Sequence, residues 1–272
     1  MSTLTSTIFC RRMLKKRHYT AAYLDYIHEL LRPLKEASYG YIPDGTELEV
    51  LDIGCGTGKD CREMHAMLAE REDVDFRITG LDHEPEFLEE AQARTSPEVF
   101  PHLRFLAGSA EALPYADDSV DYIRMERVVQ HLLHPEKVFA EAVRVLRPGT
   151  GRLVIIDTDW ASCSFSTEDL ETEWFLKEQK VVHDLTNGRA SRTLSLRVQP
   201  PLQARRSIFQ AEIREVEWAG FLFGLDRNLQ LMAERGRKGG PEFLRRMYAL
   251  EERGLFQFSW NTVMLEIWKP FS

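Results

Sequence analysis

The sequence is short of cysteine, of long apolar runs and of positive charge, and each shortage argues against a class of protein. Its 272 residues include four cysteines, none of them in a C-x-x-C pair. A disulfide framework is therefore not expected, and a reduced, cytoplasmic compartment is the simpler interpretation. No apolar run is long enough to cross a bilayer, so we expect no membrane span. The net charge of -8 differs from the basic balance of nucleic-acid-binding proteins, so we expect no nucleic-acid partner.

Acidic residues are also missing from Met1 to Leu24, whereas five basic residues cluster between Arg11 and Arg17. This composition overlaps with that of an organellar transit peptide, but a flexible basic tail is the favoured interpretation. From Tyr19 to Ala37 the apolar residues recur at helical spacing. We therefore expect residues 1–44 to form a tail and a lid helix, which packs on a sheet or covers a pocket.

What the sequence does contain is a glycine-rich turn between a short apolar strand, Glu49–Ile53, and a helix expected over Cys61–Glu70. The turn from Gly54 to Gly58 has glycine at every second position. Glycine lacks a Cβ, so such a turn can take positive φ and let a ligand lie against backbone amides. The positive end of the next helix favours an anionic ligand group, and Asp52 can accept a hydrogen bond from an ammonium group. A ligand with both groups, such as an amino acid, fits this turn.

Strands and helices alternate from Leu48 to Asp159, which predicts right-handed crossovers and a parallel sheet with helices on both faces. Ligands of such sheets bind beyond the carboxyl ends of the strands, near the point where the strand order reverses. The further strands are expected over Phe76–Asp82, His102–Ser109, Val120–Val128 and Arg152–Asp159, and the further helices over Glu84–Arg94 and Pro135–Leu146.

The C-terminal third contains no motif that we can assign. Its polar, acid-rich stretch Ser166–Thr186 and the segment Leu229–Gly254 are expected to be helical. Strands are predicted over Ile213–Phe223 and Phe256–Trp268. We expect residues 161–272 to supply helices that cap the substrate and the final strands of the sheet.

Four stretches occur in order at fitting intervals: VLDIGCGTGKD, GLDHEPEFLEEA, LAGSAEALPYADDSVDYI, and the run from ERVVQHL to RVLRPGTGRLVIID. Together they resemble the successive motifs of class I S-adenosylmethionine-dependent methyltransferases. The nearest branch is the small-molecule, ubiquinone/menaquinone-biosynthesis-like one (methyltransferase domain 11). The resemblance covers about Glu47 to Trp160. It implies a Rossmann-like sheet of seven mostly parallel strands, with the last strand antiparallel and a helical cap over the active site.

The resemblance also implies S-adenosyl-L-methionine as the cofactor, bound by a core over residues 45–160. The glycine turn would hold its methionine part, Asp82 its ribose hydroxyls, and Ser109 to Glu111 would line its adenine. Many relatives carry Asp where this chain has Ser109, and a hydroxyl accepts the adenine hydrogen bond more weakly. Asp82 also suits the N-cap of the next helix, which is the structural alternative. The candidate cofactor residues are Asp52, Gly54, Cys55, Gly56, Gly58, Lys59, Asp82, His83, Phe87, Ser109, Ala110, Glu111, Glu126, Arg127 and Val128.

The acceptor is expected to be a small, partly apolar metabolite, methylated on oxygen, nitrogen or carbon. Its candidate contacts are Tyr19, Tyr23, Gln130, His131, Asp159, Trp160 and Trp174. His131 is the candidate proton acceptor, with a hydrogen-bonded structural histidine as the alternative. His131 and His134 have i, i+3 spacing, but no third ligand follows at a suitable distance, so no metal is expected.

Three other functions share parts of this pattern. An RNA base methyltransferase shares the core, but the acidic balance counts against it. A dinucleotide oxidoreductase would carry G-x-G-x-x-G in place of G-x-G-x-G. A cyclase or binding protein that retains the cofactor without methylating stays open, as does the choice between monomer and homodimer.

Overall fold

The structure is a computed structural model that describes residues 47–71, 74–171, 189–216 and 240–271. The predicted tail and lid helix over residues 1–44 lie outside these ranges, with the candidate substrate residues Tyr19, Tyr23 and Trp174. Most of the helix predicted from Ser166, and the first part of the one predicted from Leu229, also lie outside them.

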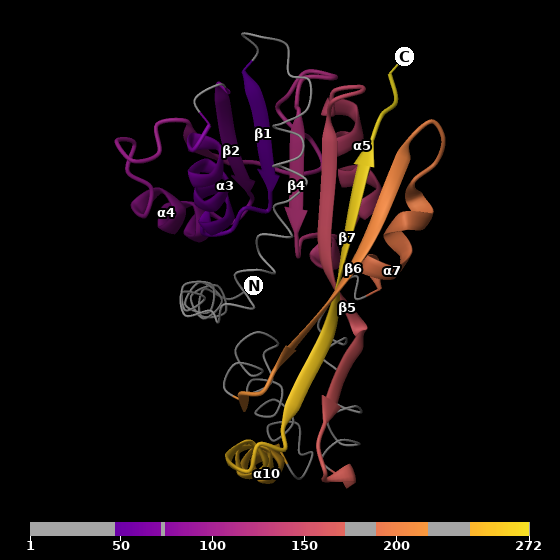
Figure 1. Ribbon diagram of the computed structural model, residues 1–272. Helices are drawn as coiled ribbons and strands as arrows, with labels where there is room; N and C mark the ends of the chain where they lie inside the picture. The colour runs from indigo at the N-terminus through magenta and orange to yellow at the C-terminus, as the bar shows by residue number, and fades with distance from the viewer. Residues whose placement is uncertain (1–46, 72–73, 172–188, 217–239, 272) are drawn as a thin grey trace.

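A single sheet of seven strands forms the centre of the protein, in the order β3-β2-β1-β4-β5-β7-β6 (Figure 1). From β3 to β5 in this order, each strand runs parallel to the next. The order reverses between β1 and β4, because β2 and β3 lie on one side of β1 and β4 lies on the other. The five expected strands are confirmed, as β1 (Leu48–Ile53), β2 (Phe76–Asp82), β3 (Leu103–Ala107), β4 (Tyr122–Glu126) and β5 (Arg152–Ser166).

Two antiparallel strands complete the sheet beyond β5. β7 (Gln257–Trp268) pairs with β5, and β6 (Gln203–Ile213) pairs with β7 at the edge. The expected antiparallel last strand is thus confirmed. The start of the strand predicted over Ile213–Phe223 is wrong, because Ile213 ends β6 and the two residues after it are not strand, and residues 217–223 lie outside the described ranges. β6 is an exposed edge strand with polar side chains such as Arg205. Its sequence therefore lacks the clear alternation of apolar and polar residues from which strands are predicted.

The last three strands extend past the others as an antiparallel arm, formed by the outer parts of β5, β6 and β7 (Figure 1). β4 ends where Glu126 pairs with Ile156. β5 runs on from there to Ser166, which adds about 30 Å of extended chain. The pairing of β5 with β7 is irregular between Asp159 and Ser164. The arm therefore leaves the core at the edge where the parallel strands end.

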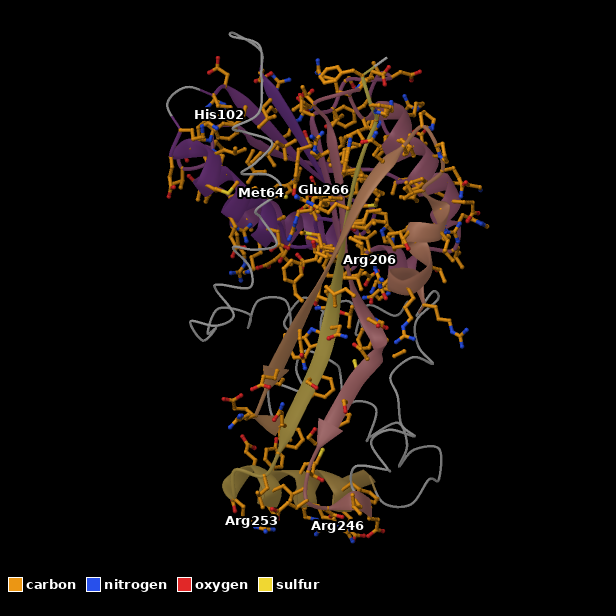
Figure 2. All side chains as sticks on the ribbon, turned by 45° about the vertical axis from the view of Figure 1, so that its right-hand side comes forward. Met64, His102, Arg206, Arg246, Arg253 and Glu266 are labelled. Atoms are coloured by element: carbon orange, nitrogen blue, oxygen red, sulfur yellow. The ribbon has the colours of Figure 1, made fainter. Side chains whose placement is uncertain are left out.

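Helix α10 (Gly240–Glu252) packs at the far end of this arm, where Figure 2 labels its Arg246 and Arg253. Arg246 lies 2.8 Å from Glu171 and 3.7 Å from Asp169, which tie the helix to the chain just after β5. An apolar cluster holds the arm together and consists of Trp160, Phe165, Val216, Met247, Leu250, Phe256, Phe258 and Trp260.

Helices cover both faces of the core sheet. α3 (Lys59–Ala69) and α4 (Pro85–Ala93) contribute Met64 and Leu88 to the cluster on one face. α5 (Pro135–Val145) lies on the other face, with the short segments η1 (Val129–His131), α7 (Ala190–Thr193) and η3 (Leu194–Arg197). The predicted helices in this region are confirmed to within two residues at each end.

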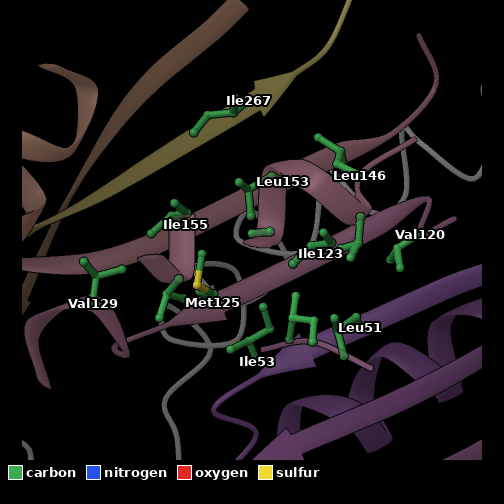
Figure 3. Close-up of a cluster of buried hydrophobic side chains, with 14 of the residues drawn as sticks. Leu51, Ile53, Val120, Ile123, Met125, Val129, Leu146, Leu153, Ile155 and Ile267 are labelled. Atoms are coloured by element: carbon green, nitrogen blue, oxygen red, sulfur yellow. The ribbon is translucent and has the colours of Figure 1, made fainter. Parts of the chain in front are cut away.

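The central strands are buried on both sides because of these helices. Ile123 and Met125 of β4 enter the cluster beneath α5, beside Leu153 and Ile155 of β5 (Figure 3). Alternate residues of a strand face opposite ways, so Tyr122 enters the cluster beneath α3 instead. The residues that share the face of Tyr122 are therefore directed into the interior next to α3.

Candidate functional site

The glycine turn follows β1 at the point where the strand order reverses. Gly54, Gly56 and Gly58 all have left-handed backbone, with φ of 73°, 54° and 68°. A Cβ on Gly54 would come within 2.5 Å of Val128, and one on Gly58 would come within 2.4 Å of Phe105. The turn therefore needs glycine for its conformation at all three positions, and for space at two of them.

Asp82 links this turn to the end of β2. Its Oδ2 accepts a hydrogen bond from the Gly56 amide at 2.8 Å, and its Oδ1 accepts one from the Glu84 amide at 3.0 Å. The residue is only 5 % exposed. Glu84 occupies the N-cap position of α4, so Asp82 supports the start of this helix without being its cap residue. A carboxylate can accept more than two hydrogen bonds, so Asp82 keeps capacity for a ligand donor.

A buried cluster of charged side chains, here called the charged quartet, lies beside the turn. It consists of Asp52, Asp60, Arg124 and Glu126. Arg124, in the middle of β4, is 1 % exposed and is the register partner of Asp52 on β1. Its guanidinium lies 4.0 Å from Asp52 and 3.3 Å from Asp60, and it donates to the Glu126 carboxylate. Three carboxylates from β1, α3 and β4 thus converge on one guanidinium.

Asp52 is the most perturbed acid of the quartet. Burial raises its pKa to about 7, because the Arg124 charge offsets this only in part and the charges of Asp60 and Glu126 add to it. The Cys61 thiol donates to its Oδ2 at 3.2 Å. An interior carboxyl group that ionises near neutral pH would be stabilised as an anion by a ligand cation. Perturbed groups of this kind cluster at functional sites.

The remaining candidate cofactor residues differ in their exposure and in their bonding partners. The Ser109 hydroxyl accepts from the Glu111 amide at 3.1 Å, and Glu111 faces Lys137 at 3.3 Å, both at the surface. His83 is exposed, with its Nδ1 3.4 Å from Asp82, whereas Lys59 is bound to Glu63 at 2.8 Å. The others contribute packing: Cys55 is buried, and Phe87, Ala110 and Val128 are partly buried.

A hydrogen-bonded chain joins the candidate acceptor residues that follow β4 to residues of β5. The Gln130 amide donates to Asp157 at 3.1 Å, and the Trp160 indole donates to the Gln130 side-chain oxygen at 2.5 Å. The Gln130 side-chain nitrogen lies 2.9 Å from His131 Nε2. Trp160 is itself 5 % exposed. The structure therefore brings Gln130, His131 and Trp160 together, in one network.

His131 is a weak base in this setting. Desolvation by the surrounding protein, with the Arg127 charge as a second cause, lowers its pKa to about 4, although the residue as a whole is exposed. The ring is thus neutral at physiological pH. With the Gln130 side-chain nitrogen as donor, Nε2 accepts and the proton of the ring lies on Nδ1.

Arg127 begins this acceptor segment with an unusual backbone. Its φ of 57° is left-handed although it is not glycine, and its amide donates to the Ile156 carbonyl at 2.8 Å. Its Nε is buried and has no hydrogen-bond partner among the residues that the structure describes. Strained backbone of this kind is often found at functional sites.

Sequence reasoning missed two arginines of this region. Arg124 stands between the apolar residues Ile123 and Met125 of β4, and this interruption was the available signal. Arg192 of α7 donates to Asp159 at 2.7 Å, a contact between distant segments that no local pattern indicates. Asp159 is therefore held by an ion pair, which fixes α7 against the start of the arm.

In the described ranges, no group of three or more His, Cys, Asp and Glu residues could hold a metal ion. None of the helices described is long and apolar enough to cross a membrane.

The arrangement suits a ligand with several polar groups rather than a metal. Backbone amides of the turn can bind an anionic group, the charged quartet can accept a cation, and Asp82 can accept hydrogen bonds from hydroxyl groups. These features lie along one edge of the sheet, with the chain from Gln130 to Trp160 beyond them.

Comparison with known proteins shows which proteins this chain is similar to. Residues 51–155 match a family model described as "Methyltransferase domain". A 37.1 kDa protein in transposon TN4556 of Streptomyces fradiae is 34 % identical over 192 residues, which are 68 % of this chain and 52 % of that protein. The demethylmenaquinone methyltransferase of Lactococcus lactis is 35 % identical over 115 residues, which are 42 % of this chain and 44 % of that enzyme.

The chain thus spans about half the length of these curated relatives. A solved structure from Bacillus halodurans C-125 is 17 % identical and aligns with a TM-score of 0.57, over 90 % of this chain and 100 % of its own. At this identity the likeness supports the fold alone.

Proposed function

We propose, from the match of residues 51–155 to a methyltransferase domain, that the protein transfers a methyl group from S-adenosyl-L-methionine to a small metabolite. The observation that carries this proposal is the geometry around Asp82. Its carboxylate is buried, holds the Gly56 amide at 2.8 Å and keeps capacity for further donors. A ribose diol offers two hydroxyl donors, and the glycine turn lies directly beside it.

The cofactor site has a part for each group of the ligand. Amides of the Gly54–Gly58 turn would bind the methionine carboxylate, and Asp52 would accept from the ammonium group. Asp82 would bind the ribose, while Ser109 to Glu111 would line the adenine. We assign this role to residues 45–160, and a covering role over the acceptor to residues 161–272.

When bound, S-adenosylmethionine supplies an electrophilic methyl group on a sulfonium, and the protein need not supply a nucleophile. The contribution of the protein is to hold the acceptor in line with the methyl group and to exclude water. Gln130, His131 and Trp160 form the network that would position the acceptor. A neutral His131 would serve as a hydrogen-bonding group, with proton removal left to solvent or to the acceptor's own ionisation.

The acceptor is proposed to be small and partly apolar, because buried Trp160 and Phe165 stand where β5 enters the arm. The net charge of -8 and the pairing of Arg205 with Glu266 at 2.7 Å argue against a nucleic-acid surface. The relative from Lactococcus lactis, named as acting on demethylmenaquinone, supports this class of acceptor. The three described cysteines are free, which fits a cytoplasmic monomer or homodimer.

The test is cofactor binding by calorimetry. Asp82→Ala should weaken S-adenosylmethionine binding by roughly 2–3 kcal/mol, because it removes a charge-assisted, two-oxygen contact. Glu89→Ala, an exposed change on α4, serves as the control and should bind normally. Unchanged affinity in a folded Asp82→Ala variant would contradict the proposed site.

Product analysis tests the reaction itself. Extracted small metabolites and total RNA are each incubated with methyl-labelled cofactor at low and high salt. We expect label in the metabolites and formation of S-adenosylhomocysteine. Label in RNA that falls steeply with salt would point to nucleic-acid methylation instead, and binding without any product would point to a non-methylating protein.

A further inference from the structure

Arg127 directly follows β4, at the edge of the sheet that carries the site. It precedes the hydrogen-bonded network of Gln130, His131 and Trp160, here called the acceptor network. Its φ of 57° lies in the left-handed region, which is unfavourable for a long side chain. Its amide still donates to the Ile156 carbonyl of β5 at 2.8 Å, so the sheet holds the strained residue in place. Strain of this kind is concentrated at sites that bind ligands.

The guanidinium of Arg127 lacks an acceptor in the part of the chain that the structure describes. Its Nε is buried there without a hydrogen-bond partner. None of the ion pairs within the described ranges includes this side chain. The preceding carboxylate, Glu126, accepts from Arg124 instead. Because a buried donor of a charged group is costly to leave unpaired, we expect a bound group to accept from it.

Two titratable side chains lie in the field of Arg127, and neither of them balances its charge. Burial and, as the second cause, this charge lower the pKa of His131 to about 4, so the ring is neutral. Asp157 uses its two carboxylate oxygens for the amides of Gln130 and Thr158, at 3.1 and 2.9 Å. Burial raises the pKa of Asp157 to about 7, although these amides and Arg127 act against it. At neutral pH this carboxyl group is therefore only partly ionised.

A second buried polar atom without a partner lies on a helix beside the acceptor network. Ser191 of α7 is 4 % exposed, and its hydroxyl has no hydrogen-bond partner among the described residues. α7 packs against η1 and β5, which supply His131 and Asp157. A hydroxyl can donate a hydrogen bond as well as accept one. Unsatisfied donors thus occur both just before η1 and on the helix packed against it, and a ligand rich in acceptor oxygens would suit them.

We propose that Arg127 binds a carboxylate of the acceptor, so that the metabolite which receives the methyl group is a small organic acid. This inference rests on the proposed function and names the class of its acceptor. A guanidinium offers two parallel N–H donors, and the two oxygens of a carboxylate match their spacing. The carboxylate also supplies the negative charge that Asp157 supplies only in part.

The first experiment identifies the charge of the acceptor with the full chain. Extracted small metabolites are separated on an anion exchanger into an acidic fraction and a neutral and basic fraction. Each fraction is incubated with the protein and methyl-labelled S-adenosylmethionine. We expect label in the acidic fraction, and we expect labelling to be lost when its carboxyl groups are first converted to ethyl esters. Labelling that survives esterification would overturn the proposal, because the acceptor would then not need a carboxylate.

The second experiment removes the guanidinium. Arg127→Gly also relieves the left-handed backbone, so this variant is expected to fold. Labelling of the acidic fraction should fall roughly 10- to 100-fold, as for a lost hydrogen bond to a charged group. Calorimetric affinity for S-adenosylmethionine should stay unchanged. Added methylguanidinium should restore part of the labelling, which a merely structural role of Arg127 would not allow.

Two further variants complete this experiment. Arg127→Lys keeps the charge without the planar fork, so it should lose less labelling than Arg127→Gly, and it gives a second measurement if Arg127→Gly does not fold. Asp118→Gly is the matched control, because Asp118 is the other residue besides glycine with left-handed backbone in the described ranges. It is exposed and distant in sequence from the acceptor network, so its glycine variant should label normally.

The outcomes separate this inference from the proposed function. If no fraction is labelled by the unaltered protein, the proposed function fails. If label appears only in the neutral and basic fraction, the proposed function stands and the carboxylate-binding role of Arg127 is overturned. Normal labelling by Arg127→Gly would overturn it as well. So would an equal loss of S-adenosylmethionine affinity in that variant, because Arg127 would then bind the cofactor.

Discussion

At the scale of the residue, the structure separates two reasons for glycine, which are a left-handed φ and a lack of space for a Cβ. Gly58 has a left-handed φ of 68° and would place a Cβ 2.4 Å from Phe105, whereas Gly254 has a φ of 69° and nothing within 4 Å. Gly254→Ala should therefore cost only the conformational penalty of about 1–2 kcal/mol. Gly58→Ala should cost about 1–3 kcal/mol more, because Phe105 must also move. Urea unfolding of the two variants measures the difference, and equal losses would mean that Phe105 yields freely.

His131 offers a second prediction at this scale. Because its pKa is about 4, the ring stays neutral between pH 6 and 9 and should not shape the pH profile of turnover in that range. We expect His131→Ala to lower turnover roughly tenfold, as for a lost positioning contact, with little change in cofactor affinity. His131→Gln retains a polar side chain and should lose less. A rate loss in His131→Ala that disappears at high pH would instead identify the ring as the proton acceptor.

At the scale of the element, the arm depends on aromatic side chains shared by two strands and α10. Phe258 of β7 is 2 % exposed, and its ring centre lies 4.6 Å from that of Phe165 on β5. Phe258→Ala should lower the free energy of unfolding by about 3–5 kcal/mol, as for other buried aromatic truncations. Ile208→Ala on β6, at a side chain that is 54 % exposed, should cost less than about 1 kcal/mol. Thermal and urea unfolding compare the two, and similar losses would mean that the arm is loosely packed.

The same elements show which parts of the fold the local sequence pattern can predict. The strands up to β4 and the helices between them have apolar periodicity that fixes their type, so they were predictable. β5 beyond Asp159 was not, because its sequence, Trp160 to Ser166, gains its strand character from pairing with β7. β6 was misplaced for a related reason, since an edge strand keeps polar side chains such as Arg206 exposed. Pairing between segments distant in sequence leaves little trace in either segment alone.

At the scale of the whole molecule, the edge of the sheet that carries the site was predictable from the rule for parallel strands. The positions of Asp52, Asp82 and Glu126 along that edge follow from strand order. The role of Arg124 was not predictable, since an arginine within a strand shows its partners only after β1, β4 and α3 are assembled. Charge balance in an interior is a property of the assembled fold.

The position of β7 between β5 and β6 has a consequence for biosynthesis. β5 and β6 both precede β7 in the chain, yet among the strands that the structure describes β6 joins the sheet only through β7, and the outer part of β5 pairs only with β7. A nascent chain would thus present the parallel core early, with one side of β5 open. Its last strand must then enter between two strands made before it, and pairings of such long sequence separation are slow to form. Completion of the arm is therefore expected to be the late event in folding, and the interval before it is when the chain is most exposed to aggregation.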